Sequence, residues 1–432
     1  MKYIYIWSLI FEPLMYFKIF DNQLIGITPN ISKFLQVVFW LTFIFNTNNL
    51  NNIKNKLIFL RCFKYYYTFL IIAIFSGMIG YIRGKYSIIY DYPNINSFGS
   101  ILYSSNIRPF IEYITYIYYY FYFLLIPLII FKEEEFLYYF KYFKITLILC
   151  LILGYIDYIS SVIGSPLLGR HISDQISVGQ RFHGISGEPR DACIYLIYSL
   201  WVLHISSLID NIKISKILLI CIFVAIFLTE SFSGIIGIII GIIILLFYGF
   251  KISLIKINSI AIIFIILLPL IILSDRIILY FDSLSSIPIN IEYNFPLQYP
   301  ISDQQNNIYP IYDFFKSLMN LDFISIMIGN GIGSASAVNN MYIGLSQQSN
   351  PNSQLVKLIY ENGVLGLVAF ILAFLQPYYF IVINYNKNKI LQTSFIYGIF
   401  VLGMILSSRN PIVFIFLGLY IAFYSSINIK NE

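Results

Sequence analysis

Long apolar runs alternate with short polar segments along the whole 432-residue chain. Each run is close to the roughly 17–25 residues that a helix needs to cross the hydrocarbon core of a bilayer. Backbone polar groups in a bilayer must be paired inside the spanning segment, which favours helices over open strands. The pattern predicts twelve helical spans, at residues 3–20, 31–47, 65–82, 110–131, 145–163, 191–209, 214–230, 233–250, 257–274, 363–383, 391–407 and 411–427.

Composition supports the same class of protein. Hydrophobic residues make up 59% of the chain and charged residues 11%, whereas about a quarter of a soluble domain is charged. The predicted fold class is therefore an all-α polytopic integral membrane protein, in which residues 1–432 form a single domain. The net charge is +6, but the lysines are spread over short loops without a basic block. A lipid bilayer is the expected environment, and nucleic acid is not an expected partner.

The two alternating sets of loops differ in their density of basic residues. Six loops, beginning with 48–64 and ending with 428–432, hold 14 Lys and Arg in 55 residues, whereas the other six hold 9 in 149. Because the loops richer in Lys and Arg stay in the cytoplasm, this difference predicts that both termini are cytoplasmic. It also places the loops 164–190 and 275–353 outside, the second of them before the last three spans.

Arginines concentrate on the predicted outer side. Seven of the eight arginines lie there, although the positive-inside rule does not require them. A guanidinium presents a planar fork of N–H donors that matches phosphate and carboxylate groups. We therefore interpret Arg170, Arg190 and Arg409 as candidate ligands of an anionic substrate. For Arg83 and Arg108, the alternative is that the side chains extend to lipid headgroups.

The densest group of ionisable residues is RFHGISGEPRDA (181–192). Pro189 predicts the start of a helix, because proline is favoured at the first helical position and moves the preceding residue out of helix. Arg190 then falls in the first turn, where a cation opposes the helix dipole unless an anion binds there. Glu188 could orient an arginine or accept a substrate hydroxyl, or it could form a surface ion pair that caps the helix. His183 could be a general base or a solvated loop residue.

Three further segments are interpreted as mainly structural. LTESFSGIIG (228–237) predicts an outer hairpin whose hydroxyl side chains pair with local backbone, and GNGIGSASA (329–337) predicts a glycine-rich turn. Glu361 is interpreted as structural, and the nearby Gly363 and Gly366 as residues that allow close helix packing. The four cysteines and three histidines lack the spacing of a metal site, so neither a metal nor a cofactor is expected.

Four motifs, taken in order, resemble one family. RFHGISGEPRDA, LTESFSGIIGIIIGII (228–243), GNGIG (329–333) and NPNSQLVKLIYENGVLGL (350–367) are similar to segments of the superfamily of Wzy-type O-antigen or capsule polymerases and O-antigen ligases. The resemblance implies a GT-C-like membrane glycosyltransferase that is inverting and independent of metal. Its donor and acceptor would be polyprenyl-pyrophosphate-linked oligosaccharides.

The resemblance also implies catalytic roles for particular residues. Arg181 and Arg276 take the places of family arginines that hold the pyrophosphate and stabilise its developing charge. The loops 164–190 and 275–353 would form the active-site region, facing outward from the inner membrane of a bacterium. A flippase and a chain-length regulator are the expected protein partners.

One departure from the family pattern favours a polymerase over a ligase. The ligase motif carries a histidine at the position of Asn352, and asparagine cannot act as a base. Asn352 is therefore interpreted as a substrate-binding residue, and Glu188 and His183 are the candidates for the base. The alternatives are a ligase that transfers finished glycan to lipid A core or another acceptor, and a lipid-linked glycan flippase or other twelve-helix transporter. The position of the charges at helix ends disfavours the transporter, because transporters place polar groups near the middle of the bilayer.

Overall fold

The computed structural model of the chain describes residues 1–14, 30–45, 60–84, 86, 107–164, 181–186, 189–210, 215–231, 322–334, 354–385 and 410–428. Over these residues the structure is helical and has no strand. The helices are α1 (Lys2–Phe11), α2 (Ile31–Ile44), α3 (Lys64–Ile82), α5 (Arg108–Tyr119), the π-helix η3 (Tyr120–Leu125), α6 (Ile126–Ile130), α7 (Glu133–Val162), α9 (Pro189–Asp210), α10 (Lys216–Leu228), α15 (Phe323–Ile328), α17 (Gln354–Tyr385) and α19 (Ile412–Asn428).

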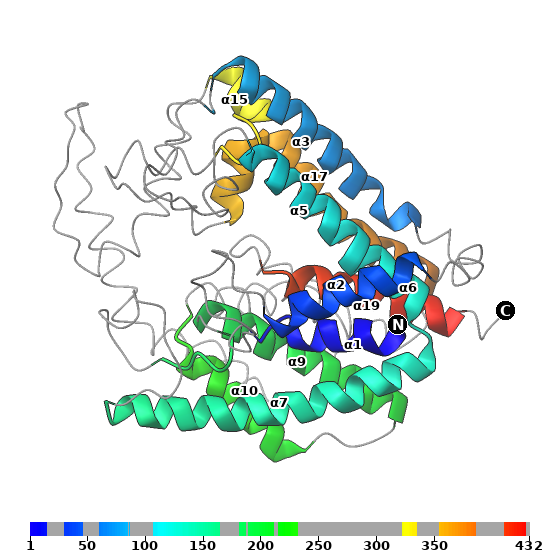
Figure 1. The fold of residues 1–432 in the computed structure, drawn as a ribbon, viewed down its shortest axis with the longest axis vertical. Coiled ribbons are helices and arrows are strands. Elements are labelled where there is room, and N and C mark those ends of the chain that lie inside the picture. The colour runs from blue at the N-terminus through cyan, green and yellow to red at the C-terminus, as the bar shows by residue number, and fades with distance from the viewer. Residues whose placement is uncertain are drawn as a thin grey trace.

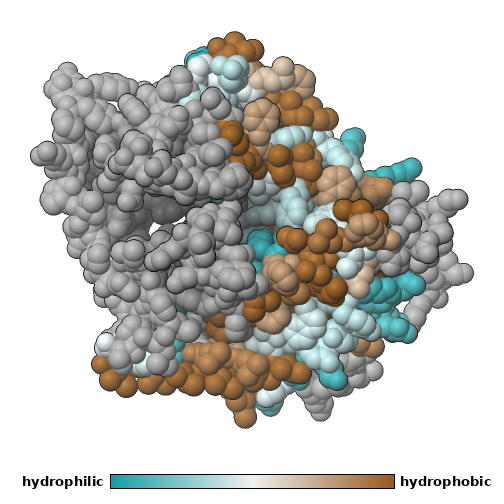
Figure 2. Space-filling model, viewed as in Figure 1, coloured by the Kyte–Doolittle hydropathy of each residue, from teal (hydrophilic) through white to brown (hydrophobic). Residues whose placement is uncertain are grey.

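Among the described residues, four helical segments are long and apolar enough to cross a membrane: Leu60–Ile82, Pro109–Ile130, Glu133–Val162 and Lys357–Pro377. Large apolar side chains are exposed along α3 and α7, and Figure 2 shows such apolar surface along the upper and lower edges of the molecule. Both features agree with the predicted class of membrane protein. The predicted spans 233–250, 257–274 and 391–407 lie outside the described residues, so the number of spans and their orientation stay predictions.

The helices form two groups joined by α19 (Figure 1). In the upper group α17 packs against α3 and α15, and α3 packs against α5. In the lower group α1 contacts α2 and α7, while α9 and α10 contact α7 and each other. The last helix, α19, contacts η3, α6, α7, α9 and α17. The start of α1 and the end of α19 lie on the same side of the molecule in Figure 1.

The span predicted at 110–131 is interrupted by a π-helical turn, η3. Local widening of a helix leaves carbonyl groups without their usual partners. In η3 the Tyr5 hydroxyl donates to the Tyr122 carbonyl at 2.6 Å. The Tyr66 hydroxyl adds a second donor, at 2.9 Å, to the Tyr116 carbonyl, which also accepts from the Tyr120 N–H. A side chain at Gly418 would overlap the Phe123 carbonyl, so this glycine allows α19 to lie directly against η3.

Two boundaries differ from the sequence prediction. Residues 132–144 were expected to be a loop, but Lys132 is the N-cap of α7, and residues 133–144 belong to this helix. Its first turn is capped, because the Glu135 carboxylate accepts from the Lys132 N–H at 3.1 Å and pairs with Lys2. Aromatic residues at helical spacing then face the core, at Phe136, Tyr139, Phe140 and Phe143. Within the span predicted at 3–20, α1 ends at Phe11, and residues 15–20 lie outside the described part of the chain.

Candidate functional site

Arg181 lies against the end of α10 that precedes the predicted outer hairpin. Its Nε donates to the Thr229 carbonyl at 3.0 Å and its Nη2 to the Glu230 carbonyl at 2.9 Å. The next residue, Phe182, donates its N–H to the Leu228 carbonyl at 2.8 Å. The last carbonyls of a helix lack partners within the helix and are free to accept such bonds. The end of α10 therefore fixes the plane of the Arg181 guanidinium.

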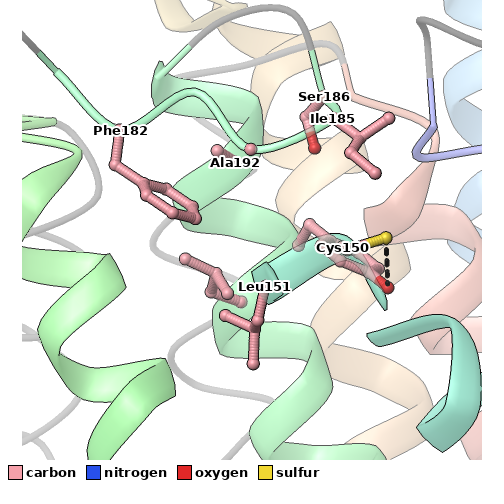
Figure 3. A pocket seen from close by; sticks show the side chains of 9 residues that line it. Cys150, Leu151, Phe182, Ile185, Ser186 and Ala192 are labelled. Atoms are coloured by element: carbon pink, nitrogen blue, oxygen red, sulfur yellow. Dashed lines mark hydrogen bonds between the residues drawn. The ribbon is translucent and has the colours of Figure 1, made fainter. Parts of the chain in front are cut away.

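The segment after Arg181 is held by apolar packing. Figure 3 shows the side chains of Phe182, Ile185 and Ser186 around a small cavity that also borders α7 and α9. The Phe182 ring lies over Gly154 of α7, where a Cβ atom would approach it to 2.6 Å. Gly184 adopts a positive φ of 56° that favours glycine. The RFHGIS segment is thus anchored by α10 on one side and by α7 on the other.

The helix α9 begins at Pro189, which confirms the predicted start. Arg190 is its second residue and is partly exposed. Asp191 accepts a hydrogen bond from Asn410 Nδ2 at 2.9 Å, and Asn410 Oδ1 accepts from the Ile412 N–H at 2.9 Å. This buried pair joins the start of α9 to the start of α19.

His183 is buried, with 2% of its surface exposed. The interpretation of this residue as a solvated loop histidine is therefore wrong. Of the predicted site residues, the structure describes Arg181, His183 and Arg190. The other predicted site residues lie outside the described part of the chain: Glu188, Arg170, Arg276, Arg409 and Asn352.

A second polar site joins α5 and α17, and the sequence interpretation missed it. Lys357 Nζ lies 3.2 Å from a carboxylate oxygen of Glu112 and 3.9 Å from one of Glu361. The three residues are 2%, 5% and 0% exposed, respectively. Buried charges are stable only when they are paired. We call these three side chains the ion cluster.

A sequence signal for the ion cluster does exist. Lys357 and Glu361 are four residues apart, so they share one face of a helix. Glu112 is an acid inside a predicted span, where an ionisable side chain needs a partner. Lys357 was one of several cations at the same predicted side of the membrane. The sequence did not indicate which two helices would bring them together.

Residues 322–334 form a short segment, here called the strap, that lies on an interruption in α17. Gly363 has φ 64° and ψ −173°, which breaks the helical hydrogen-bond pattern there. The strap fills this break, because the Asn330 N–H donates to the Tyr360 carbonyl at 2.8 Å and the Gly331 N–H donates to the Glu361 carbonyl at 3.0 Å. The Ser76 hydroxyl of α3 also donates to the Glu361 carbonyl. The glycine-rich turn predicted from GNGIG is confirmed.

The far end of the strap is fixed at the surface. Asp322 caps α15, since its carboxylate accepts from the Ser325 N–H at 3.3 Å. Arg83 pairs with both oxygens of the same carboxylate and donates to the Ser325 hydroxyl at 2.8 Å. Because Arg83 pairs with Asp322, its contacts do not support the interpretation that its side chain extends to lipid headgroups. Further along, the Tyr86 hydroxyl donates to the Ile332 carbonyl at 2.8 Å.

Replacing Gly329 by alanine is expected to destabilise the fold more than replacing Gly164. Both glycines have a strongly positive φ, 95° and 92°, which costs a non-glycine residue about 1–3 kcal/mol. A Cβ at Gly329 would overlap the Glu361 carbonyl, whereas nothing lies within 4 Å of one at Gly164. Thermal unfolding of the purified variants should give a lower Tm for Gly329→Ala. Equal Tm values would show that the strap does not lie closely on α17.

No protein-family model matches this chain, and no curated protein matches it. The family resemblance therefore rests on the four sequence motifs given above, and it stays a prediction. Separately from this resemblance, the structure describes two polar sites: the anchored Arg181 segment and the ion cluster with its strap.

Proposed function

We propose that the protein is a membrane glycosyltransferase that polymerises polyprenyl-pyrophosphate-linked oligosaccharide repeat units at the outer face of the cytoplasmic membrane of a bacterium. An acceptor hydroxyl attacks the anomeric carbon of the donor, the bond to the lipid pyrophosphate breaks, and the hydroxyl proton passes to a base. The lipid pyrophosphate leaves with the electron pair. Neither a metal nor a cofactor is required in this proposal.

The geometry of Arg181 is the observation that carries the proposal. Its guanidinium is oriented by the Thr229 and Glu230 carbonyls, at 3.0 and 2.9 Å. An oriented cation stabilises charge that develops on a leaving group without first reorganising. Arg190, in the first turn of α9, adds a second guanidinium near helix N–H groups, which bind anions well. Arg276 completes the proposed pyrophosphate site.

The proposed base is His183 or Glu188. His183 is buried, so it is shielded from bulk water. In the chain it follows the anchored Arg181 by two residues. A base must lie within hydrogen-bond reach of the proton that it accepts. In the proposed complex, the acceptor hydroxyl would lie beside the RFHGIS segment, with the pyrophosphate on the arginines.

A flippase or another transporter is the second candidate, and one observation favours it. The break at Gly363 lies two residues from the buried ion cluster. Interrupted helices with polar groups beside the interruption are common where transporters bind substrates and coupling ions. On this alternative, α17 would move lipid-linked units across the membrane, and Arg181 would bind their pyrophosphate at the outer face.

Surface glycan and lipid-linked intermediates from a strain that lacks the gene distinguish the two functions. We expect single repeat units in the deletion strain and a ladder of longer chains after complementation. The intermediates should be on the outer leaflet, because flipping precedes polymerisation. Repeat units trapped on the inner leaflet would contradict the polymerase and support the flippase, and long polymer held on the polyprenyl carrier would indicate a ligase.

A further inference from the structure

The end of α10 presents three successive carbonyls to the RFHGIS segment. The Leu228 carbonyl accepts from the Phe182 N–H, and the Thr229 and Glu230 carbonyls accept from the Arg181 guanidinium. In a helix that continued, these carbonyls would accept from N–H groups further along the same helix. The way in which α10 ends therefore decides whether Arg181 is held.

Glu230 ends α10 with a backbone conformation that residues other than glycine rarely adopt. Its φ is 46°, in the left-handed region, and it is the one non-glycine residue with a positive φ among the described residues. Its N–H donates to the Phe227 carbonyl at 3.0 Å, which is one of the two hydrogen bonds of a Schellman motif. Glycine or asparagine usually occupies this position. Backbone outliers of this kind cluster at functional sites, where the surrounding structure maintains them.

The Thr229 hydroxyl supports this helix end. It donates to the Ile226 carbonyl at 2.7 Å and accepts from the Ser231 N–H at 3.3 Å. In a Schellman motif these two backbone groups would bond each other directly, so here the hydroxyl stands between them. The Thr229 side chain is completely buried. One buried hydroxyl thus joins the residues on either side of the two carbonyls that hold Arg181.

We propose that Thr229 and Glu230 are positioning residues for Arg181, because the hydroxyl of the first and the left-handed backbone of the second direct two carbonyls at its guanidinium. This inference rests on the proposed function, in which Arg181 stabilises the pyrophosphate leaving group. A cation that is already held in one plane stabilises the developing charge without first reorganising. Glu230 acts through its backbone in this proposal, and its carboxylate is not required.

Phenylglyoxal measures how firmly Arg181 is held, and it needs no glycan substrate. The reagent closes a ring with two guanidinium nitrogens, so the hydrogen bonds from Nε and Nη2 should slow its reaction with Arg181. The full chain in lipid nanodiscs is treated with the reagent, and peptide mapping gives the rate at each arginine. Glu230→Val should raise the rate at Arg181 at least about fivefold, because β-branched residues are strained in the left-handed region. The rate at the exposed Arg61 should not change.

Two further variants show whether the backbone or the charge of Glu230 is responsible. Glu230→Gly permits the same φ, and Glu230→Gln removes the charge at almost constant size. Both should keep the slow rate at Arg181. A rate in Glu230→Gly as fast as that in Glu230→Val would overturn the proposal, and so would a fast rate in Glu230→Gln.

Thr229→Val and Thr229→Ser form a second pair, which decides the matter if Glu230→Val does not fold. Valine has nearly the shape of threonine but lacks the hydroxyl, so the Ile226 carbonyl and the Ser231 N–H lose their shared partner. Serine keeps the hydroxyl. Arg181 should therefore react faster in Thr229→Val than in Thr229→Ser, and equal rates in this pair would overturn the proposal.

Turnover of lipid-linked repeat units by the purified protein separates positioning from a purely structural role. For each folded molecule, Glu230→Val should lower kcat by about tenfold or more, with KM little changed, because a misplaced group weakens an interaction made in the transition state. Glu230→Gly should restore kcat. An unchanged kcat in Glu230→Val, with Arg181 reacting faster, would overturn the positioning role. If the wild-type chain forms no polymer, the proposed function fails, and the phenylglyoxal rates alone decide whether Thr229 and Glu230 position Arg181.

Discussion

Lys357→Met is expected to destabilise the folded protein by about 3–5 kcal/mol, the usual effect of removing one member of a buried ion pair. Glu112 and Glu361 lie within 4.0 Å of the Lys357 ammonium and are almost fully buried. Without it, two carboxylates remain close together in a medium of low dielectric constant, where like charges repel strongly. The Tm of the purified protein should fall, and the amount of folded protein in the membrane should fall with it.

A neutral version of the same site is the control for Lys357→Met. The triple variant Glu112→Gln, Lys357→Met and Glu361→Gln removes all three charges, so most of the lost stability should return. Lys33→Met is a second control, because Lys33 is exposed and its partner Glu12 also accepts from Gln36 at 2.5 Å. If Lys357→Met is no less stable than Lys33→Met, the ion cluster does not stabilise the contact between α5 and α17.

Arg181→Ala is expected to lower polymer formation by about 10²–10³-fold, the effect of removing one preorganised donor from a charged transition state. Arg181→Lys should restore little of this activity, since an ammonium cannot reproduce the planar fork that bonds Thr229 and Glu230. The measurement is the glycan ladder of the deletion strain carrying each variant, with membrane protein levels measured in parallel.

Arg61→Ala is the matched control for Arg181→Ala, because Arg61 is exposed and lies on the predicted cytoplasmic side. The hydrogen bond from Gln376 Nε2 to the Arg61 carbonyl, at 2.9 Å, does not involve the Arg61 side chain and is kept in the variant. Arg61→Ala should form a normal ladder. A normal ladder from Arg181→Ala at equal protein level would remove Arg181 from the proposed mechanism.

The sequence was sufficient where the cause of a structure is local. Pro189 marks the start of α9 because proline restricts its own φ and the conformation of the residue before it. The glycines of GNGIG mark a turn because Gly329, Gly331 and Gly333 take positive φ values that other residues avoid. Apolar runs of bilayer length likewise indicated helices, and four such helices are described.

Charge patterns misled the sequence prediction at α7. Residues 132–144 contain three acids and three lysines, which suggested a loop between spans. The acids lie in the first turn, where their negative charge interacts favourably with the helix dipole. Aromatic residues on one face of the helix pack into the core. The charged residues of this stretch lower its mean hydropathy, although the residues on the buried face of the helix are apolar.

By itself, the sequence determined the helical membrane class, the start of α9 and the turns, because each depends on residues that are neighbours in the chain. Only the tertiary structure decided that Lys357 meets Glu112, that Arg181 lies on the end of α10, and that the strap fills the break at Gly363. Residues distant in sequence meet only after helices pack, and many pairings of apolar helices satisfy the same hydropathy pattern. The choice among them depends on side-chain packing and buried polar pairs, which no local pattern contains.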